Sequence, residues 1–174
     1  MSIINEIFLI LILILINALL AMSEAALVAS RKVRLQQQAN DGNKSSELAL
    51  KLLKDPNIFL STVQIGITLI GVLAGAVGGA TISEALALAL QKIPYLGEFS
   101  ESISLAIVVL TITVLTIWLG ELVPKRLGLT SPEKIAQAVA GPMLFTSKAF
   151  SPLIKLMSKA TNFASSCKYR LFHS

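Results

Sequence analysis

The stretch SISLAIVVLTITVLTIWLGELVPKR, residues 102–126, decides the fold class of this chain. Its first part, residues 102–120, carries no charged side chain, and about 20 such residues in a helix cross the hydrocarbon core of a bilayer. Glu121 follows within the apolar run, and Pro124 stands just behind it. Because an acid is costly at that depth and a proline removes a helical hydrogen bond, the stretch predicts a spanning helix that also carries a polar site.

Two other stretches have the same apolar character. Residues 7–23 carry no charge and their pattern continues to Ser30, and residues 57–83 also lack charged side chains. Of the 174 residues, 54% are hydrophobic and 14% are charged, and the mean hydropathy is +0.74, a profile typical of membrane proteins. We therefore predict an all-α membrane protein with three transmembrane helices, at about residues 4–30, 57–80 and 102–123.

The first apolar stretch has an alternative interpretation as a cleaved secretory signal. A signal begins with a basic segment, but no Lys or Arg precedes Arg31, and the run is long for a signal core.

Residues able to carry out chemistry are few: Cys167 has no partner for an intrachain disulfide, and the lone His173 is expected to be a solvated tail residue. Without a nucleophile–base pair or phosphate-binding loop, we expect no enzymatic activity.

The basic residues predict the orientation of the chain in the membrane. They gather between the first two spans and after the third, whereas Lys92 alone lies between spans two and three. By the positive-inside rule, residues 31–56 and the C-terminus lie in the cytoplasm, and the N-terminus and residues 84–101 lie outside. The net charge of +5 then reflects topology and contact with anionic lipid. We predict a multi-pass protein of the plasma (inner) membrane, with no nucleic-acid partner.

Shorter helices are expected outside the spans. Residues 45–56 predict a cytoplasmic helix capped by Ser45 or Ser46, and residues 83–92 predict a separate helix outside. Residues 131–165 predict interfacial amphipathic helices, broken or kinked at the prolines, with lysines on one face. A fourth span is the alternative for this region, although lysines are costly in hydrocarbon. The prolines and lysines concerned are Pro142, Pro152, Lys148, Lys155 and Lys159.

Polar side chains occur at a similar depth in all three predicted spans, counting about 1.5 Å per helical residue from the cytoplasmic boundary. Lys125 belongs to the basic signal that ends span three, so we expect no intramembrane cation to pair with the acids. Oxygen ligands that include carboxylates suit a hard cation such as Mg²⁺ or Ca²⁺, and Na⁺ is compatible. The candidates are Ser23, Ser61, Gln64, Thr68 and Glu121, with Glu24 and Thr62 as secondary ones.

Pro124 is expected to release a backbone acceptor beside the acid. It cannot donate to the carbonyl four residues earlier, which belongs to Gly120. A bound cation would satisfy that carbonyl, as in the broken helices of transporters. Each polar residue also has a structural interpretation: hydroxyls and amides make interhelical hydrogen bonds, and glutamates at an interface can extend to water. Taken together, the set favours a binding site.

A stripe of glycines follows on span two. Gly71, Gly75 and Gly79 recur at every fourth position, which allows close approach of another helix. That helix can belong to the same chain or to a second copy. Glycines here also make the span pliable, as a carrier that rearranges requires.

Three motifs occur in order along the chain: MSEAAL (22–27), LSTVQIGITLIGVLAGAVGG (60–79) and GELVPKR (120–126). They resemble the DUF21 transmembrane domain of the CorC/CNNM (cyclin M, hemolysin C-like) family of magnesium transporters, over residues 1–165, with 166–174 as a tail. The resemblance implies a three-span domain with juxtamembrane helices, usually dimeric, that exports Mg²⁺ in exchange for Na⁺. It also implies that Mg²⁺ is held with little or no water between the three spans.

By motif, the resemblance assigns Ser23, the Gly120 carbonyl and Glu121 as ligands of the ion. The family often has an asparagine where this chain has Ile67. The span-two ligand is therefore expected to be one of Gln64, Thr68 and Ser61. Family members usually continue into cytoplasmic CBS domains that bind adenine nucleotide, which are absent here, so we expect no nucleotide site in this chain.

The sequence therefore predicts secondary active export of Mg²⁺ by a homodimer, coupled to Na⁺ entry. One alternative is a membrane anchor that senses Mg²⁺ and regulates attached domains without transport. Another is a membrane-lytic, hemolysin-like protein, which would carry a long polar stripe along each span. Spans one and three lack such a stripe.

Overall fold

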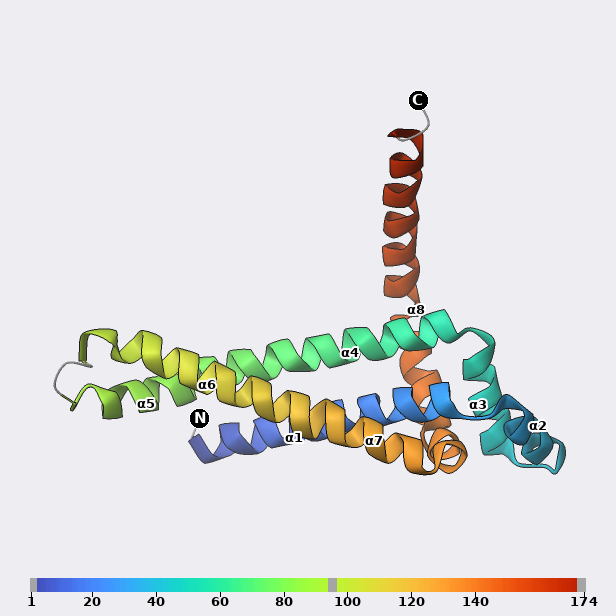
Figure 1. Ribbon diagram of the computed structural model, residues 1–174, viewed down its shortest axis with the longest axis horizontal. Helices are drawn as coiled ribbons and strands as arrows, with labels where there is room; N and C mark the ends of the chain where they lie inside the picture. The colour runs from blue at the N-terminus through green and yellow to red at the C-terminus, as the bar shows by residue number, and fades with distance from the viewer. Residues whose placement is uncertain (1–2, 94–96, 172–174) are drawn as a thin grey trace.

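The computed structural model describes the backbone of residues 3–93 and 97–171, with side chains through Ile154 and at Leu156 and Met157. Within these residues three helical segments are long and apolar enough to cross a membrane, and no strand occurs. The segments lie side by side in an elongated bundle (Figure 1). They are Ile3–Ala29, Pro56–Leu90 and Gly97–Thr130. The predicted fold class, an all-α membrane protein with three spanning helices, is confirmed.

The second and third spans each contain one π-helical turn. In the second span, α4 (Pro56–Val77) passes into α5 (Ser83–Leu90) through η1 (Gly78–Ile82). In the third, the 3₁₀ turn Gly97–Phe99 leads into α6 (Ser100–Ile117), which passes into α7 (Val123–Thr130) through η3 (Trp118–Leu122). The short helix predicted at 83–92 is present as α5, but it is continuous with α4, because a wider π turn absorbs the local irregularity and keeps the span unbroken.

Two short helices connect the first span to the second. The span α1 (Ile3–Ala29) is followed by α2 (Lys32–Asn40) and α3 (Lys44–Lys54), with Gly42 at a φ of +92° in the turn between them, a conformation that favours glycine. Asn43 caps α3 by accepting hydrogen bonds from the backbone N–H groups of Ser45 and Ser46. The predicted serine cap is thus wrong by two or three positions, since asparagine serves equally well there.

The C-terminal helix α8 (Pro132–Leu171) runs across the bundle rather than along it (Figure 1). It continues through Pro142 and Pro152, so the two prolines, predicted as breaks or kinks, do not end the helix. The interfacial position that the lysine pattern predicted for this region stays a prediction. Lys148 is exposed, and the side chains of Lys155 and Lys159 lie outside the described residues, as do those of Cys167 and His173.

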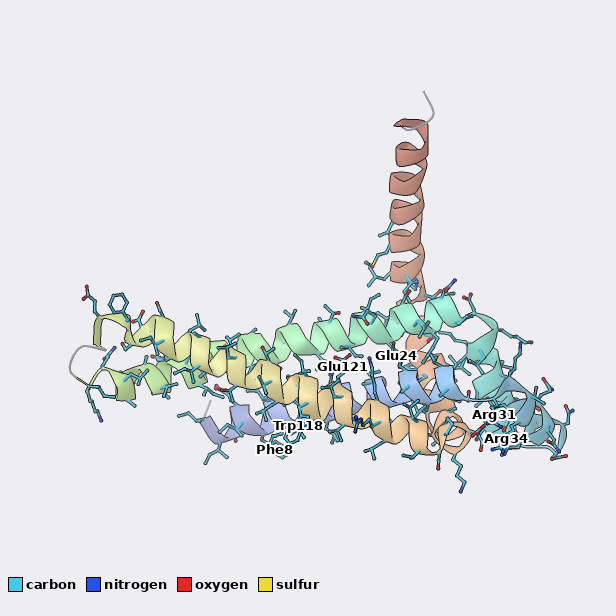
Figure 2. The ribbon with its side chains drawn as sticks, viewed as in Figure 1. Phe8, Glu24, Arg31, Arg34, Trp118 and Glu121 are labelled. Carbon is cyan, nitrogen blue, oxygen red and sulfur yellow. The ribbon has the colours of Figure 1, made fainter. Side chains whose placement is uncertain are left out.

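The bundle core has two clusters of buried apolar side chains. One lies at the end of the bundle near α2 and α3 and joins α1 to α2, α3, α4 and α8. The other lies toward the N-terminal end of α1 and joins α1 to α4 and α6. Gly128 lets the third span approach α1 closely, because a Cβ there would lie 2.7 Å from the Met22 carbonyl oxygen. Large apolar side chains such as Phe8 and Trp118, 64% and 57% exposed, cover the outer surface of the bundle (Figure 2), as lipid contact requires.

Candidate cation site

The site is built around the π-helical turn of the third span. Gly120 lies within this turn and is buried, and Pro124 is buried in the first turn of α7. The Gly120 carbonyl oxygen accepts a hydrogen bond from Asn17 Nδ2 of α1 at 3.1 Å. A Cβ at position 120 would lie 3.0 Å from that nitrogen, so glycine is what allows the approach. The carbonyl predicted to be open is therefore occupied by a side-chain amide.

Asn17 was missed by the sequence analysis. It is 1% exposed, and its Oδ1 has no hydrogen-bond partner among the described residues. The signal was present, because Asn17 is the single polar residue in the run 7–22 and polar groups in spans usually face the bundle interior. Only the rotation of α1 against η3 reveals that it meets Gly120.

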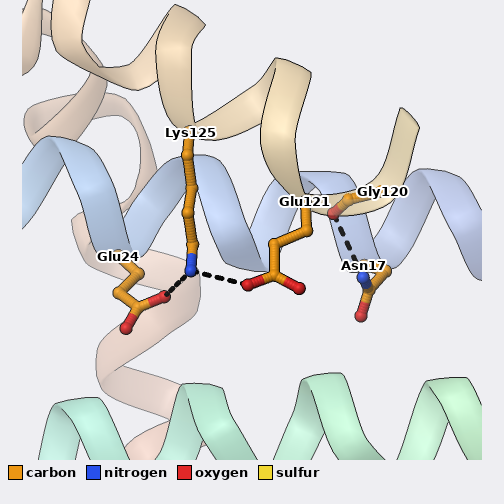
Figure 3. Close-up of polar contacts among 5 residues, drawn as sticks. All are labelled: Asn17, Glu24, Gly120, Glu121 and Lys125. Atoms are coloured by element: carbon orange, nitrogen blue, oxygen red, sulfur yellow. Dashed lines mark hydrogen bonds and ion pairs between the residues drawn. The ribbon is translucent and has the colours of Figure 1, made fainter. Parts of the chain in front are cut away.

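Lys125 joins two carboxylates from different helices. Its Nζ lies 2.8 Å from Glu121 Oε1, one turn earlier in the same span, and 3.3 Å from Glu24 Oε2 of α1 (Figure 3). The three side chains are between 24% and 37% exposed. The expectation that no cation pairs with the acids is therefore wrong. Lys125 folds back along α7 toward the site, because residues four apart share one helix face.

The cluster of Glu24, Glu121 and Lys125 has two carboxylates and one ammonium, hence one excess negative charge. Partial burial makes such an excess costly, because removing charge from water is only repaid by a partner of opposite sign. Figure 3 shows the cluster and the Asn17–Gly120 pair in sequence along the contact between α1 and the third span. The arrangement can accept one more cation, if that cation itself carries hydrogen-bond donors.

The other predicted site residues are engaged elsewhere. Ser23 is buried and its hydroxyl donates to the Leu19 carbonyl of its own helix, and Thr62 donates to the Ile58 carbonyl at 2.7 Å. Such bonds to the preceding turn are common for hydroxyls in helices. Gln64 and Thr68 lie on the exposed surface of α4, and Ser61 is half-buried. Among the described residues, no hydrogen bond or ion pair links these five to the cluster.

The glycine stripe of span two is largely unused within the chain. Among the described residues, a Cβ at Gly71 or Gly75 would meet nothing within 4 Å, and one at Gly79 would lie 3.4 Å from Leu105 Cδ1. Gln64 and Thr68 belong to the same side of α4, since positions separated by three or four residues share a face. This surface of α4 is therefore open.

Comparison with known proteins gives the family. A model described as the cyclin M transmembrane N-terminal domain matches residues 8–168. The chain belongs to the cyclin M family. It is a multi-pass membrane protein.

Several curated cyclin M relatives are similar over most of this chain. A UPF0053 protein of Synechocystis is 48% identical over 157 residues, which are 90% of this chain and 35% of the relative. The polyamine export protein of Salmonella typhimurium is 36% identical over 91% of this chain and 35% of its own length. That of Haemophilus influenzae is 32% identical over 93% of this chain and 37% of its own. The cyclin M domain described here thus spans about a third of the length of these relatives.

Proposed function

We propose that this chain forms the membrane part of a cation exporter whose substrate is a polyamine. The observation that carries the proposal is the Lys125 ammonium, held between Glu121 and Glu24 inside a transmembrane bundle. A polyamine presents the same primary ammonium on a flexible alkyl chain. A site that holds a lysine tip in this way therefore has the charge and shape to hold the end of such a substrate. The relatives named polyamine export proteins support the same substrate class.

The charge of the cluster favours an added monovalent ammonium. Two carboxylates share one lysine, so one substrate ammonium brings the cluster to neutrality. Each acid then has its own cation, which offsets the desolvation of both. A flexible diamine needs no rigid cage, because each of its ammonium groups carries three N–H donors that adapt to available acceptors.

Asn17 extends the site toward the outer half of the bundle. Its buried Oδ1 lacks a partner among the described residues, a condition that costs about 1–3 kcal/mol, and an ammonium N–H would remove that cost. Asn17 lies seven residues before Glu24 on α1, about 10 Å along the helix. An alkyl chain lying between α1 and the third span can therefore place one ammonium at the acids and direct the other toward the Asn17 amide.

The position of the cluster supports export from the cytoplasm. Glu24 lies close to the end of α1 that leads into the basic segment with Arg31 and Arg34, and the positive-inside rule assigns that end to the cytoplasm. A polyamine entering from the cytoplasm meets the acids first. Toward the outside, the core consists of apolar side chains from α1, α4 and α6, which close the path until the spans rearrange.

A second candidate substrate is Mg²⁺, exported in exchange for Na⁺ as the family resemblance implies. The oxygens that favour it are those of Glu121, the Gly120 carbonyl and Asn17 Oδ1, which lie near one another (Figure 3). Mg²⁺ requires close, nearly octahedral oxygens and loses water reluctantly. The Gly120 oxygen already accepts from Asn17 and the Glu121 carboxylate already holds Lys125, so the polyamine accounts better for this arrangement.

The test is transport by the full-length protein in liposomes. We expect flux of radiolabelled putrescine down its gradient, and reduced flux in Glu24→Gln but not in Glu47→Gln, which changes an exposed acid of α3. Flux of Mg²⁺, followed with an internal dye and dependent on a Na⁺ gradient, would instead support the second candidate. Binding without flux would indicate a sensor or anchor, and dye leakage would indicate a lytic pore; either result would overturn the proposal.

The open surface of α4 favours a homodimer. Gly71 and Gly75 leave room for a close helix contact that no described residue fills, and Gln64 and Thr68 supply polar groups beside it. Glycines of this spacing bring helices together in membranes. The proposed assembly therefore joins two copies through α4, in the plasma (inner) membrane, with the N-terminus outside and the C-terminus in the cytoplasm.

A further inference from the structure

A cavity of about 430 Å³ lies where the first and third spans reach the cytoplasmic end of the bundle. It is separate from the Glu24–Lys125–Glu121 cluster and shares no residue with it. Its lining comes from the end of α1, the start of α2, the end of α7 and the first turn of α8. Two segments far apart in the sequence, residues 29–34 and 129–134, therefore enclose it, and the close packing of Gly128 on Met22 holds them together.

The cavity is basic. Arg31, Arg34 and Lys134 line it, together with one acid, Glu133. Glu133 pairs with Arg34, at 3.8 Å between Oε1 and Nη1, whereas Arg31 and Lys134 form no ion pair with any described residue. Figure 2 shows Arg31 and Arg34 next to one another at this end of the bundle. The cavity therefore keeps an excess of positive charge that its own walls do not neutralise.

The backbone adds to this charge. Ser131 directly precedes α8, which begins at Pro132, and Glu133 and Lys134 of its first turn also line the cavity. The first turn of a helix has N–H groups without carbonyl partners and a partial positive charge. Arginine side chains bind phosphate oxygens through several hydrogen bonds at once. The groups lining the cavity are thus those that recognise a phosphate.

Apolar side chains continue from the cavity toward the bilayer. Leu129, 57% exposed, belongs to the lining, and Val28, 65% exposed, precedes the Ala29 of the lining by one residue. The helix α8, which lies across the bundle (Figure 1), places its first turn at the level where the spans end. A ligand that fits both parts has an anionic head toward Arg31 and an apolar tail along the spans.

We propose that this cavity binds the headgroup phosphate of an anionic phospholipid of the inner leaflet. Arg31 and Lys134 hold the phosphate, and Leu129 with Val28 contacts the acyl chains. Binding ties the end of α1, the end of α7 and the start of α8 together at the membrane surface. The inference does not depend on the identity of the transported cation.

The experiment titrates the detergent-solubilised full-length protein with short-chain phosphatidylglycerol, short-chain phosphatidylcholine and inorganic phosphate, and follows thermal unfolding. We expect the wild type to be stabilised most by phosphatidylglycerol. The double variant Arg31→Gln/Lys134→Gln should lose about tenfold in apparent affinity for it, because two direct phosphate partners are removed. The matched control is Lys32→Gln/Lys44→Gln, which removes the same charge from exposed positions outside the lining, and should stay within about twofold.

Leu129→Asn separates a lipid from a soluble phosphate. We expect it to weaken phosphatidylglycerol binding and to leave the weaker effect of inorganic phosphate unchanged. Equal protection of the wild type by inorganic phosphate and by phosphatidylglycerol would overturn the lipid assignment in favour of a soluble anion. Equal losses in the two double variants would overturn the site itself, since general surface charge would then explain the binding. Each variant's unfolding temperature without ligand shows whether it is folded.

Discussion

The two π-helical turns of the bundle, η1 in the second span and η3 in the third, differ in what surrounds them. Both contain a glycine that approaches α1: a Cβ at Gly78 would lie 3.4 Å from Ile10 Cδ1, and one at Gly120 would lie 3.0 Å from Asn17 Nδ2. At Gly78 of η1 the neighbours are apolar, because a Cβ there would meet Ile10 and Ile112. Around η3 they are an amide, two acids and a lysine.

This difference shows how a backbone irregularity becomes a binding site. A π turn widens the helix and lets a neighbouring helix approach. In both turns a glycine is the point of close approach. At η1 the approach serves close apolar packing. At η3 it brings the Gly120 carbonyl to Asn17 and places Glu121 beside Lys125 and Glu24. The chemistry of α1, apolar at Ile10 and polar at Asn17, is what separates the two.

The largest effect is expected from removing the charge at η3. Glu121→Gln should lower putrescine flux about tenfold or more, because it removes one of the two partly exposed carboxylates that would receive the substrate ammonium, and a hydrogen bond to a charged group contributes about 1.5–3 kcal/mol. Thr81→Val, a shape-conserving change within η1, should leave flux within about twofold. Flux is measured in liposomes at equal amounts of folded protein. Retained flux in Glu121→Gln would remove the distinction between the turns.

Removing the lysine tests whether its ammonium stands in for the substrate. Lys125→Met should raise the apparent affinity for putrescine about tenfold, since the two acids would have no other cation. Lys54→Met, which removes an exposed lysine of α3 without an ion-pair partner among the described residues, is the control and should leave that affinity unchanged. Isothermal calorimetry of the purified protein gives both values. A fall in affinity in Lys125→Met would mean that the lysine only holds the acids in place.

A third change, at η1, should affect stability and spare transport. Gly78→Ala places a Cβ 2.0 Å from Ile112 Cδ1, and such overpacking destabilises by about 1–3 kcal/mol. Adding Ile112→Val removes the clashing methyl group and should restore part of the unfolding temperature. Thermal unfolding in detergent measures this, and flux per folded molecule should remain that of the wild type. A flux defect that Ile112→Val does not relieve would assign η1 a role in transport.

Asn17→Leu should change stability by about 1 kcal/mol or less, because the lost hydrogen bond to Gly120 is offset by removal of the unpaired Oδ1. Its expected consequence is a loss of about threefold to tenfold in putrescine affinity. The counterpart at η1 is Ile10→Val, which should cost about 0.5–1.5 kcal/mol of stability with affinity unchanged. If the two variants lower affinity equally, Asn17 has no direct role in binding.

The smallest effect is expected on the open surface of α4. Gly75→Ala meets nothing within 4 Å in the chain and should change stability by about 0.5 kcal/mol or less. Gly75→Leu, by contrast, should reduce the dimer fraction measured by light scattering in detergent, if α4 packs against a second copy. An unchanged oligomeric state in Gly75→Leu would move the proposed dimer contact elsewhere.

Local sequence was enough to determine the three spans and the positions of Glu121 and Pro124 along the third. Hydropathy, charge distribution and helical spacing depend on neighbours along the chain, so they can be read directly. The close approach at Gly120 was also predicted, although its partner was expected to be an ion. Even so, the cap of α3 and the continuity of α4 into α5 were missed, since each depends on small local choices between similar conformations.

What only the tertiary structure decided is which polar groups meet. The rotation of α1 against the third span, set in part by Gly128 against Met22, brings Asn17 to Gly120 and Lys125 to Glu24. The rotation of α4 leaves Gln64 and Thr68 on its outer surface. Depth along a helix follows from counting residues, but the direction in which a side chain points is set by packing between helices. For that reason the sequence placed the acids at the right level, and the fold selected their partners.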